Sequence, residues 1–150
     1  MGLMEDLQQK ITYFDTSIFV YSVENNQEFG SICQELMLGL ENNQLNAITS
    51  ELTLSEALVF PFRNAHLETQ RKYQEIIETS GSLLVVPIVR HILIRAAELR
   101  AGQPSLKTPD AIHLATALET GCEVFLTNDT RIKSPDLEII TLSSLISKPS

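Results

Sequence analysis

Residues 108–129 read TPDAIHLATALETGCEVFLTND and combine one helix with one strand. Thr108 and Pro109 are two independent helix-start signals, a capping hydroxyl and a proline at the first helical position. Gly121 ends the helix, and residues 123–126 then predict a short strand. A helix that leads directly into such a strand is typical of a parallel sheet covered by helices.

The remainder of the chain repeats this alternation of short apolar strands and helices. Further strands are predicted over residues 11–14, 45–48, 83–86 and 137–142. The predicted helices run from a Thr16–Ser17 cap to residue 24, over 29–40, from a Thr49–Ser50 cap to Pro61, over 67–79 and 88–101, and after residue 142. This order predicts an α/β fold, a three-layer α/β/α arrangement around a short, mostly parallel central sheet.

The length of 150 residues fits a single domain over residues 1–150. We expect its core to span about residues 11–146, with flexible ends at residues 1–8 and 147–150. Residues 83–89 are the longest apolar stretch and are far too few to cross a bilayer. Since no segment resembles a signal peptide either, we expect no membrane association and a cytoplasmic location.

The net charge restricts the kinds of partner. Lys and Arg number 11 and Asp and Glu number 19, which gives a net charge of −8. Phosphate contacts normally come from Lys and Arg, so an acidic chain is a poor nonspecific binder of nucleic acid. Any nucleic-acid function must therefore rest on a local basic rim or on metal ions.

Four acidic residues lie at or just past apolar segments, namely Asp15, Glu56, Asp110 and Asp129. Asp15 and Asp129 each follow a predicted strand. Asp110 lies in the first turn of a predicted helix, and Glu56 lies about two turns into another. Strand ends and the starts of returning helices share one edge of a parallel sheet, so the four carboxylates converge there if their strands are neighbours.

A cluster of carboxylates suits a hard divalent cation. Mg²⁺ takes oxygen ligands and is typically held by carboxylates together with substrate phosphates. The absence of His and Cys from the four candidates argues against zinc. Each residue alone also has an ordinary explanation: a helix cap for Asp15, the helix dipole for Asp110, a turn for Asp129 and solvation for Glu56. Together, they favour one site.

Four motifs carry a resemblance to a known family: YFDTS at residues 13–17, SEA at 55–57, PDAIHLATA at 109–117 and FLTND at 125–129. With these motifs in this order, the chain resembles the PIN-domain family. It is most similar to the small VapC-like toxins of bacterial type II toxin–antitoxin pairs. The resemblance extends over residues 11–142.

The resemblance implies a metal-dependent endoribonuclease. By that resemblance Asp15, Glu56, Asp110 and Asp129 are the catalytic residues and hold Mg²⁺ or Mn²⁺. The implied chemistry is attack of a metal-activated water on an RNA phosphodiester, which leaves a 5′-phosphate and a 3′-hydroxyl. The implied partners are an RNA substrate, a second copy of the chain in a homodimer, and a small antitoxin that covers the active-site groove. The predicted helices over 29–40 and 67–79 are candidate surfaces for it, and the alternative is that their apolar stripes belong to the core.

Further candidates lie beside the four acidic residues. Three second-tier candidates match the flanking motif pattern: Ser17, Thr127 and Asn128. His113 lies one helical turn after Asp110, so both can face the same side. A structural histidine is the first interpretation of His113, and orientation of a carboxylate is the alternative. Lys107 and Arg131 each lie within three residues of a candidate aspartate and are the best-placed members of a basic RNA-binding rim.

Two other functions are compatible with the sequence. An aspartate-based phosphatase would also place its nucleophile after the first strand, at Asp15, but it requires a second aspartate where Ser17 stands. A PIN-like module that binds RNA or protein without turnover is the other alternative. Its expected feature is an incomplete set of acidic residues, and here all four are present.

Overall fold

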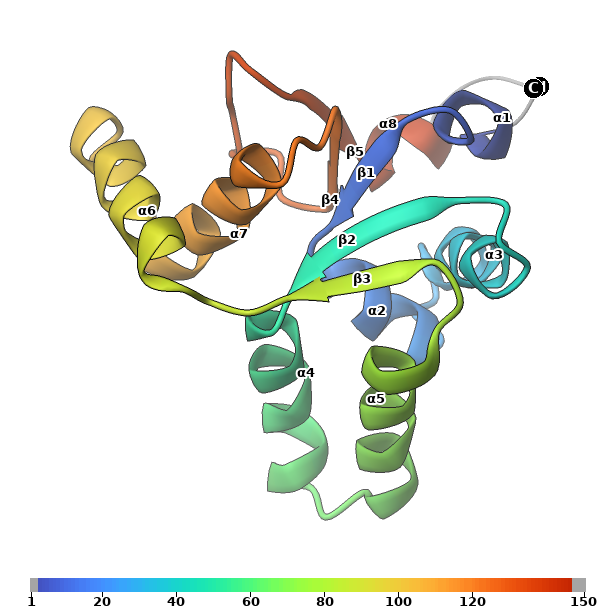
Figure 1. Ribbon diagram of the computed structural model, residues 1–150. Coiled ribbons are helices and arrows are strands. Elements are labelled where there is room, and N and C mark those ends of the chain that lie inside the picture. The colour runs from blue at the N-terminus through green and yellow to red at the C-terminus, as the bar shows by residue number, and fades with distance from the viewer. Residues whose placement is uncertain (1–2, 147–150) are drawn as a thin grey trace.

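The computed structural model describes residues 3–146, which form one five-stranded sheet with helices on both faces (Figure 1). Each pair of neighbouring strands is parallel, and the strand order is β3-β2-β1-β4-β5. The strands are β1 (Ile11–Phe14), β2 (Asn46–Ser50), β3 (Leu83–Val86), β4 (Val124–Thr127) and β5 (Glu138–Thr141). The predicted α/β fold with a short parallel sheet is confirmed.

The helices form two layers and a projecting hairpin. They are α1 (Leu3–Leu7), α2 (Thr16–Val23), α3 (Gly30–Glu41), α4 (Leu52–Arg63), α5 (Leu67–Thr79), α6 (Arg90–Gly102), α7 (Thr108–Glu119) and α8 (Leu142–Ile146). One buried cluster joins the sheet to α1, α2, α3 and α8, and a second joins it to α6 and α7. Helices α4 and α5 extend away from the sheet as a hairpin (Figure 1). Within residues 3–146, no helix has both the length and the apolar character needed to cross a bilayer.

Side chains that alternate between the two faces of the central strands contribute to both buried clusters. Phe14 in β1 packs into the cluster beneath α2 and α3, whereas its neighbour Tyr13 packs into the cluster beneath α7. Tyr13 stacks on Phe125 of β4 with ring centroids 5.0 Å apart. Successive side chains of a strand point to opposite faces, and a strand covered on both faces is mostly apolar. Strand β1 is therefore anchored on both sides.

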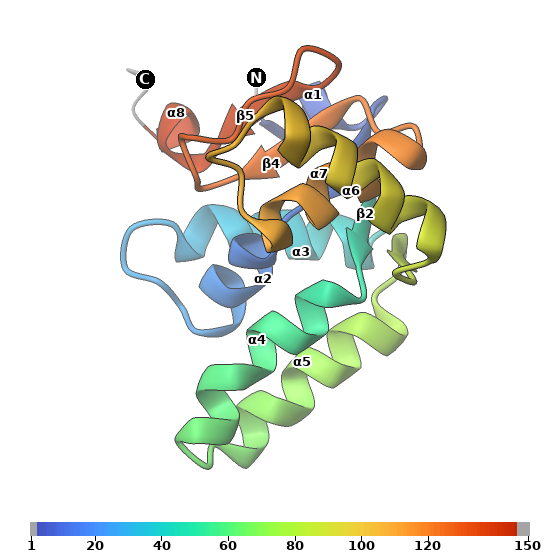
Figure 2. The same ribbon diagram turned by 90° about the vertical axis from the view of Figure 1, so that its left-hand side faces the viewer.

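The strand order creates a switch point between β1 and β4. From β1 the chain passes outward to β2 and β3, and it then returns to β4 and β5 on the other side of β1. The connections at the carboxyl ends of β1 and β4 therefore diverge and leave a crevice, where open α/β sheets bind ligands. Figure 2 looks toward this edge, with α7 lying above α2 and α4.

Two local expectations differ from the structure. Pro61 is expected to end or kink its helix, and it does not end it, since α4 continues to Arg63. A proline removes only one helical hydrogen bond, and Pro61 is itself buried. Residues 3–8 also depart from the expected flexible end, since α1 forms there and buries Leu7 in the core. Residues 1–2 and 147–150 of the expected flexible ends lie outside the described residues.

Candidate functional site

The carboxyl edge of the sheet brings together the acidic residues from four separate segments. Asp15 directly follows β1, and Asp129 lies two residues beyond β4. Asp110 lies in the first turn of α7, and Glu56 lies in the second turn of α4. A pocket of about 90 Å³ is lined by Asp15, Thr16, Ser17, Glu56, Asp110 and His113. A second pocket of about 100 Å³ includes Asp110 as well, together with Asp129, Lys107 and Arg131.

Asp15 is the N-cap of α2 and spans the switch point. Its Oδ1 accepts hydrogen bonds from the Ser17 backbone N–H at 2.9 Å and from Ser17 Oγ at 2.5 Å. Its Oδ2 accepts a hydrogen bond from Thr127 Oγ1, which belongs to β4. Burial raises the pKa of Asp15 above its ordinary value, and the hydrogen bonds from Ser17 and Thr127 oppose this rise only in part. Its negative charge is therefore under-compensated.

The motif after β4 divides into different roles. Thr127 is buried, contacts Asp15 and also accepts the backbone N–H of Asp129 at 3.0 Å. Asn128 instead donates its side-chain amide to the Tyr21 hydroxyl of α2 at 2.8 Å. The Asn128 amide, which was expected near the carboxylates, thus contacts α2 instead. This contact holds the loop after β4 and does not reach the pocket.

Glu56 is held by two donors on the same oxygen. Thr16 Oγ1 donates to Glu56 Oε1 at 2.6 Å, and His113 Nε2 lies 2.7 Å from the same atom. Burial raises the pKa of Glu56, but the hydrogen bonds from His113 and Thr16 outweigh it and place the pKa below its ordinary value. His113 is buried and also contacts the Tyr13 hydroxyl. The contact of His113 with a carboxylate agrees with the alternative interpretation of this residue.

Asp110 and Asp129 differ in whether a cationic side chain offsets their negative charge. Asp129 accepts hydrogen bonds from Arg131 Nε and Nη2, both at 3.0 Å, and these contacts lower its pKa. Burial and the charge of Asp129 raise the pKa of Asp110. Across residues 3–146, neither Asp110 nor Asp15 forms a salt bridge. Two of the four carboxylates thus have an ionic or imidazole partner, and two have none.

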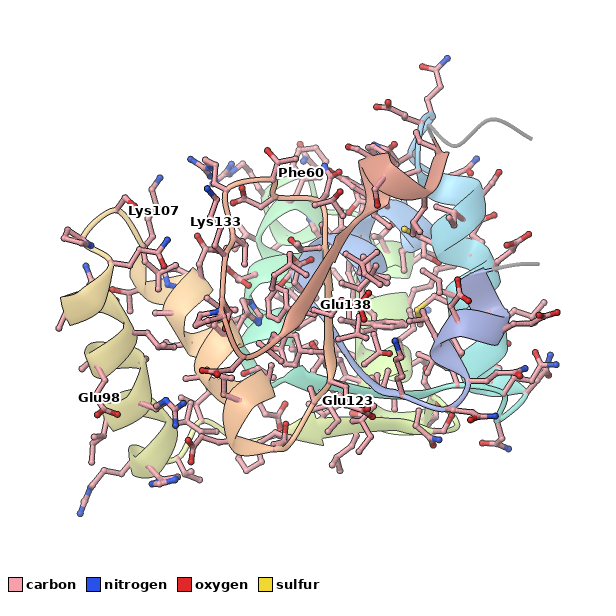
Figure 3. All side chains as sticks on the ribbon, turned by 90° about the horizontal axis from the view of Figure 1, so that it is seen from above. Phe60, Glu98, Lys107, Glu123, Lys133 and Glu138 are labelled. Atoms are coloured by element: carbon pink, nitrogen blue, oxygen red, sulfur yellow. The ribbon has the colours of Figure 1, made fainter. Side chains whose placement is uncertain are left out.

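Lys107 and Arg131, the expected basic rim, occupy different positions. Arg131 is exposed but directed at Asp129, so its guanidinium is already paired. Lys107 is exposed at the start of α7 and lines the same pocket as Asp110. In Figure 3, Lys107 and Lys133 both lie on the left, the side toward which β2 and β3 end in Figure 1. The pocket that Asp110 and Asp129 line therefore has cationic neighbours despite the net negative charge.

The oxygen donors match a hard divalent cation in chemistry, and the raised pKa values of Asp15 and Asp110 reveal charges that a cation would neutralise. Among residues 3–146, however, no three acidic, His or Cys side chains are close enough to hold a metal together. Glu56 instead contacts His113, and Asp129 contacts Arg131. Asp15 and Asp110 are the members that remain without such a partner.

Thr16 and Tyr13 belong to this site as well, although neither is among the site residues predicted from sequence. Thr16 is expected to be a helix cap, but Asp15 supplies that cap and Thr16 contacts Glu56. Tyr13 could have been identified from sequence, because it lies within a strand predicted to be buried and a buried tyrosine hydroxyl requires a hydrogen-bond partner. That partner is His113 of α7, 100 residues away in the chain.

Comparison with known proteins identifies a family that this chain matches. A model of the family described as PIN domain matches residues 12–137. Ribonuclease VapC1 of Aquifex aeolicus (strain VF5) is 28% identical over 76 residues, which cover 50% of this chain and 53% of that protein. The chain thus spans about half the length of the curated relative that it matches.

Solved structures share the fold over most of the chain. A toxin–antitoxin complex from Klebsiella pneumoniae has a TM-score of 0.65 and 21% identity, covering 87% of this chain and 97% of that chain. VapBC2 from Rickettsia felis, bound to a promoter DNA fragment, has a TM-score of 0.66 and 19% identity, covering 87% and 98%. VapC20 from Mycobacterium tuberculosis, described as a sarcin-ricin loop cleaving toxin, has a TM-score of 0.64 and 14% identity, covering 89% and 93%. At these identities the likeness establishes the fold.

Proposed function

This chain belongs to the PIN-domain family, and on that premise we propose that it is a divalent-metal-dependent endoribonuclease, the toxin of a toxin–antitoxin pair. The observation that carries the proposal is the pocket at the switch point, which Asp15, Glu56 and Asp110 all line. Two of these carboxylates have raised pKa values and no cationic partner within residues 3–146. Carboxylates without a cationic partner attract a divalent cation, and a bound divalent cation would attract the phosphate of a substrate.

We propose that Asp15 and Asp110 form the core of the metal site, with Glu56 and Asp129 completing it. When bound, Mg²⁺ or Mn²⁺ would polarise the phosphoryl oxygens and lower the pKa of water. Ser17 and Thr127 orient Asp15 by donating to its two oxygens. Glu56 Oε1 is engaged by its two donors, so Oε2 is the oxygen that remains for a ligand or a proton.

The proposed RNA substrate requires a positive rim around this pocket. Lys107 and Arg131 line the adjoining pocket with Asp110 and Asp129, so they are within reach of a phosphate that approaches the carboxylates. Arg131 can exchange its contact with Asp129 for a phosphate, because guanidinium binds both groups through the same pair of donors. This arrangement lets an acidic protein bind RNA locally.

The proposed protein partner is an antitoxin, as in the toxin–antitoxin complexes that share this fold. Of the two helical surfaces considered from sequence, α3 buries its apolar stripe in the core. The other, α5, exposes Leu67, and the neighbouring helix α4, which was not a candidate surface, exposes Val59, Phe60 and Phe62. Figure 3 labels Phe60 among them. We propose the α4–α5 hairpin as the antitoxin surface, and we retain the homodimer and the single domain over residues 1–150 as proposals.

Two alternatives are separable from the ribonuclease. An aspartate-based phosphatase requires a second aspartate two residues after its nucleophile, whereas Ser17 stands there and donates a hydrogen bond to Asp15. A binding module without turnover is favoured by one observation, the lack of three ligands placed together within residues 3–146. Its signature would be RNA binding without cleavage.

The test is Mn²⁺ binding by calorimetry, followed by cleavage of a mixed RNA panel with Mg²⁺ or Mn²⁺. We expect Asp110→Asn to reduce cleavage by a factor on the order of 100 or more, because the metal supplies several kcal/mol of transition-state stabilisation. Asp136→Asn is the matched control, since it makes the same chemical change at an exposed site. A wild-type chain that binds no divalent ion would sink the proposal, and binding of RNA without cleavage would support the module.

A further inference from the structure

Three buried or half-buried side chains form a continuous chain of hydrogen bonds beneath the pocket. The Tyr13 hydroxyl of β1 lies 2.5 Å from Nδ1 of His113 in α7. Nε2 of the same imidazole lies 2.7 Å from Oε1 of Glu56 in α4. Tyr13 and His113 are almost fully buried, with 0% and 4% of their surface exposed. The three residues thus connect the sheet, α7 and α4 at one point.

The directions of these hydrogen bonds follow from the acceptor at the end of the chain, which is the Glu56 carboxylate. A glutamate is ionised near neutral pH, and a carboxylate only accepts hydrogen bonds. Nε2 of His113 must therefore carry the proton that it shares with Glu56. In the neutral ring Nδ1 is then the acceptor, and the Tyr13 hydroxyl donates to it.

The position of the imidazole is itself fixed by packing. The Tyr13 ring stacks on Phe125 with an angle of 8° between the planes. The His113 ring meets the edge of Tyr13 with centroids 5.7 Å apart. Because these rings are packed in the core, the donor that His113 presents to Glu56 has a defined position. Glu56 is a long, half-buried side chain and would otherwise keep considerable rotamer freedom.

We propose that His113, oriented by Tyr13, is a positioning residue that holds Glu56 by Oε1 and leaves Oε2 for the pocket. Thr16 donates to the same Oε1, so both donors constrain one oxygen. Within residues 3–146, no hydrogen bond reaches Oε2. The role in metal binding rests on the proposed function, whereas the orientation of Glu56 does not. Groups that orient a metal ligand in this way typically change metal affinity by about 10–100-fold when they are removed.

Two substitutions of His113 separate positioning from packing. His113→Gln retains an amide N–H at about the reach of Nε2 and can still donate to Glu56. His113→Asn is shorter, reaches only about as far as Nδ1 and leaves Glu56 without this donor. Thr116→Val is the control for a general loss of stability, because Thr116 is buried one turn further along α7 and bonds only to the carbonyl of Ile112.

The measurement is the Mn²⁺ dissociation constant by calorimetry, with thermal unfolding in EDTA recorded for each variant. We expect His113→Asn to weaken Mn²⁺ binding about 10-fold or more, and His113→Gln to stay within about 3-fold of wild type. Thr116→Val is expected to lower stability without changing Mn²⁺ affinity. Equal losses of affinity in the Asn and Gln variants, or no loss in either, would overturn the positioning role.

Nuclear magnetic resonance tests the orientation without metal or RNA. We expect the ¹⁵N spectrum of the metal-free protein to show His113 with an unprotonated Nδ1 and a protonated Nε2. The ¹³C signal of the Glu56 carboxylate should move in His113→Asn and in Tyr13→Phe, and remain near its wild-type position in His113→Gln. The opposite tautomer, or an unchanged Glu56 signal in His113→Asn, would overturn the proposal. If wild type binds no Mn²⁺ while these signals behave as expected, the proposed function fails and the orientation stands.

Discussion

Asp15→Asn is expected to stabilise the metal-free protein while it weakens metal binding. The substitution keeps the side-chain shape and an oxygen that can accept the Ser17 backbone N–H at the N-cap of α2. It removes a charge whose burial raises the pKa of Asp15. The two effects have opposite signs in the absence and presence of a divalent cation, so one variant tests both.

The size of the stabilisation follows from two opposing contributions. Asp15 accepts three hydrogen bonds, and a charged acceptor makes each about 1 kcal/mol stronger than a neutral one. Burying an ion has an effective penalty of several kcal/mol. Since the raised pKa shows that burial dominates, we expect a net gain on the order of 1 kcal/mol at pH 7. That gain corresponds to a rise in Tm of roughly 2–4 °C for a chain of this size.

The pH dependence has a defined sign. A carboxyl whose folded pKa is raised above its ordinary value of 3.8 binds more protons in the folded state than in the unfolded state. The free energy of unfolding of wild type therefore falls as pH rises from 3.8 through the folded pKa. The advantage of Asp15→Asn should be absent below pH 3.8 and reach its full size above the folded pKa.

Thermal unfolding in EDTA and in saturating Mn²⁺, each over a range of pH, measures these effects. At a Mn²⁺ concentration of about 100 times Kd, the linkage relation gives wild type about 2.7 kcal/mol, or roughly 5–10 °C in Tm. We expect Asp15→Asn to gain less than half of that. The exposed Asp136→Asn should stay within about 0.5 kcal/mol of wild type throughout. A variant less stable than wild type in EDTA at pH 7, or equal Mn²⁺ stabilisation of both proteins, would refute the reasoning.

Three further changes test single contacts. Arg131→Gln should raise the pKa of Asp129 toward its ordinary value in a ¹³C titration, because hydrogen bonds from Arg131 hold that pKa low, and should leave the unfolding midpoint almost unchanged since the Arg131 side chain is exposed. Tyr73→Phe should lower the free energy of unfolding in urea by about 1.5–3 kcal/mol, because the buried Tyr73 hydroxyl donates to the Glu24 carboxylate; an unchanged urea midpoint would contradict this contact. Gly81→Ala should lower it by about 1–3 kcal/mol, because the added methyl would strike a backbone carbonyl of α3, and wild-type stability would show that the turn can shift.

The parts of the fold that depend on local pattern were predictable from sequence. The Thr108–Pro109 start signal and the apolar runs ending at Phe14 and Thr127 mark α7, β1 and β4, because capping chemistry and apolar length are local properties. The placement of Asp15 and Asp110 at one edge followed from parallel topology. The strand order itself could not be predicted, because β1 and β4 pair through residues more than 100 positions apart in the chain.

The contacts that tune the site were not predictable in the same way. The partner of His113 depends on how α4 and α7 lie against each other, which no sequence spacing specifies. Arg131 is only two residues from Asp129, yet their pairing depends on the local turn. Helix α1 was missed because it is one short turn whose stability comes from burial of Leu7 in the core rather than from helix propensity.

The hydrogen bond from Thr127 to Asp15 has a consequence for the time at which the site forms during synthesis. The two residues are 112 positions apart, so Asp15 leaves the ribosome long before its partner. At a synthesis rate of about 5–20 residues per second, the interval is roughly 6–22 s. During that interval β1 lacks one of its two neighbouring strands, and the carboxylate lacks a donor on Oδ2. A chain that terminates before β4 therefore cannot assemble the switch-point crevice or the Asp15–Thr127 contact within it.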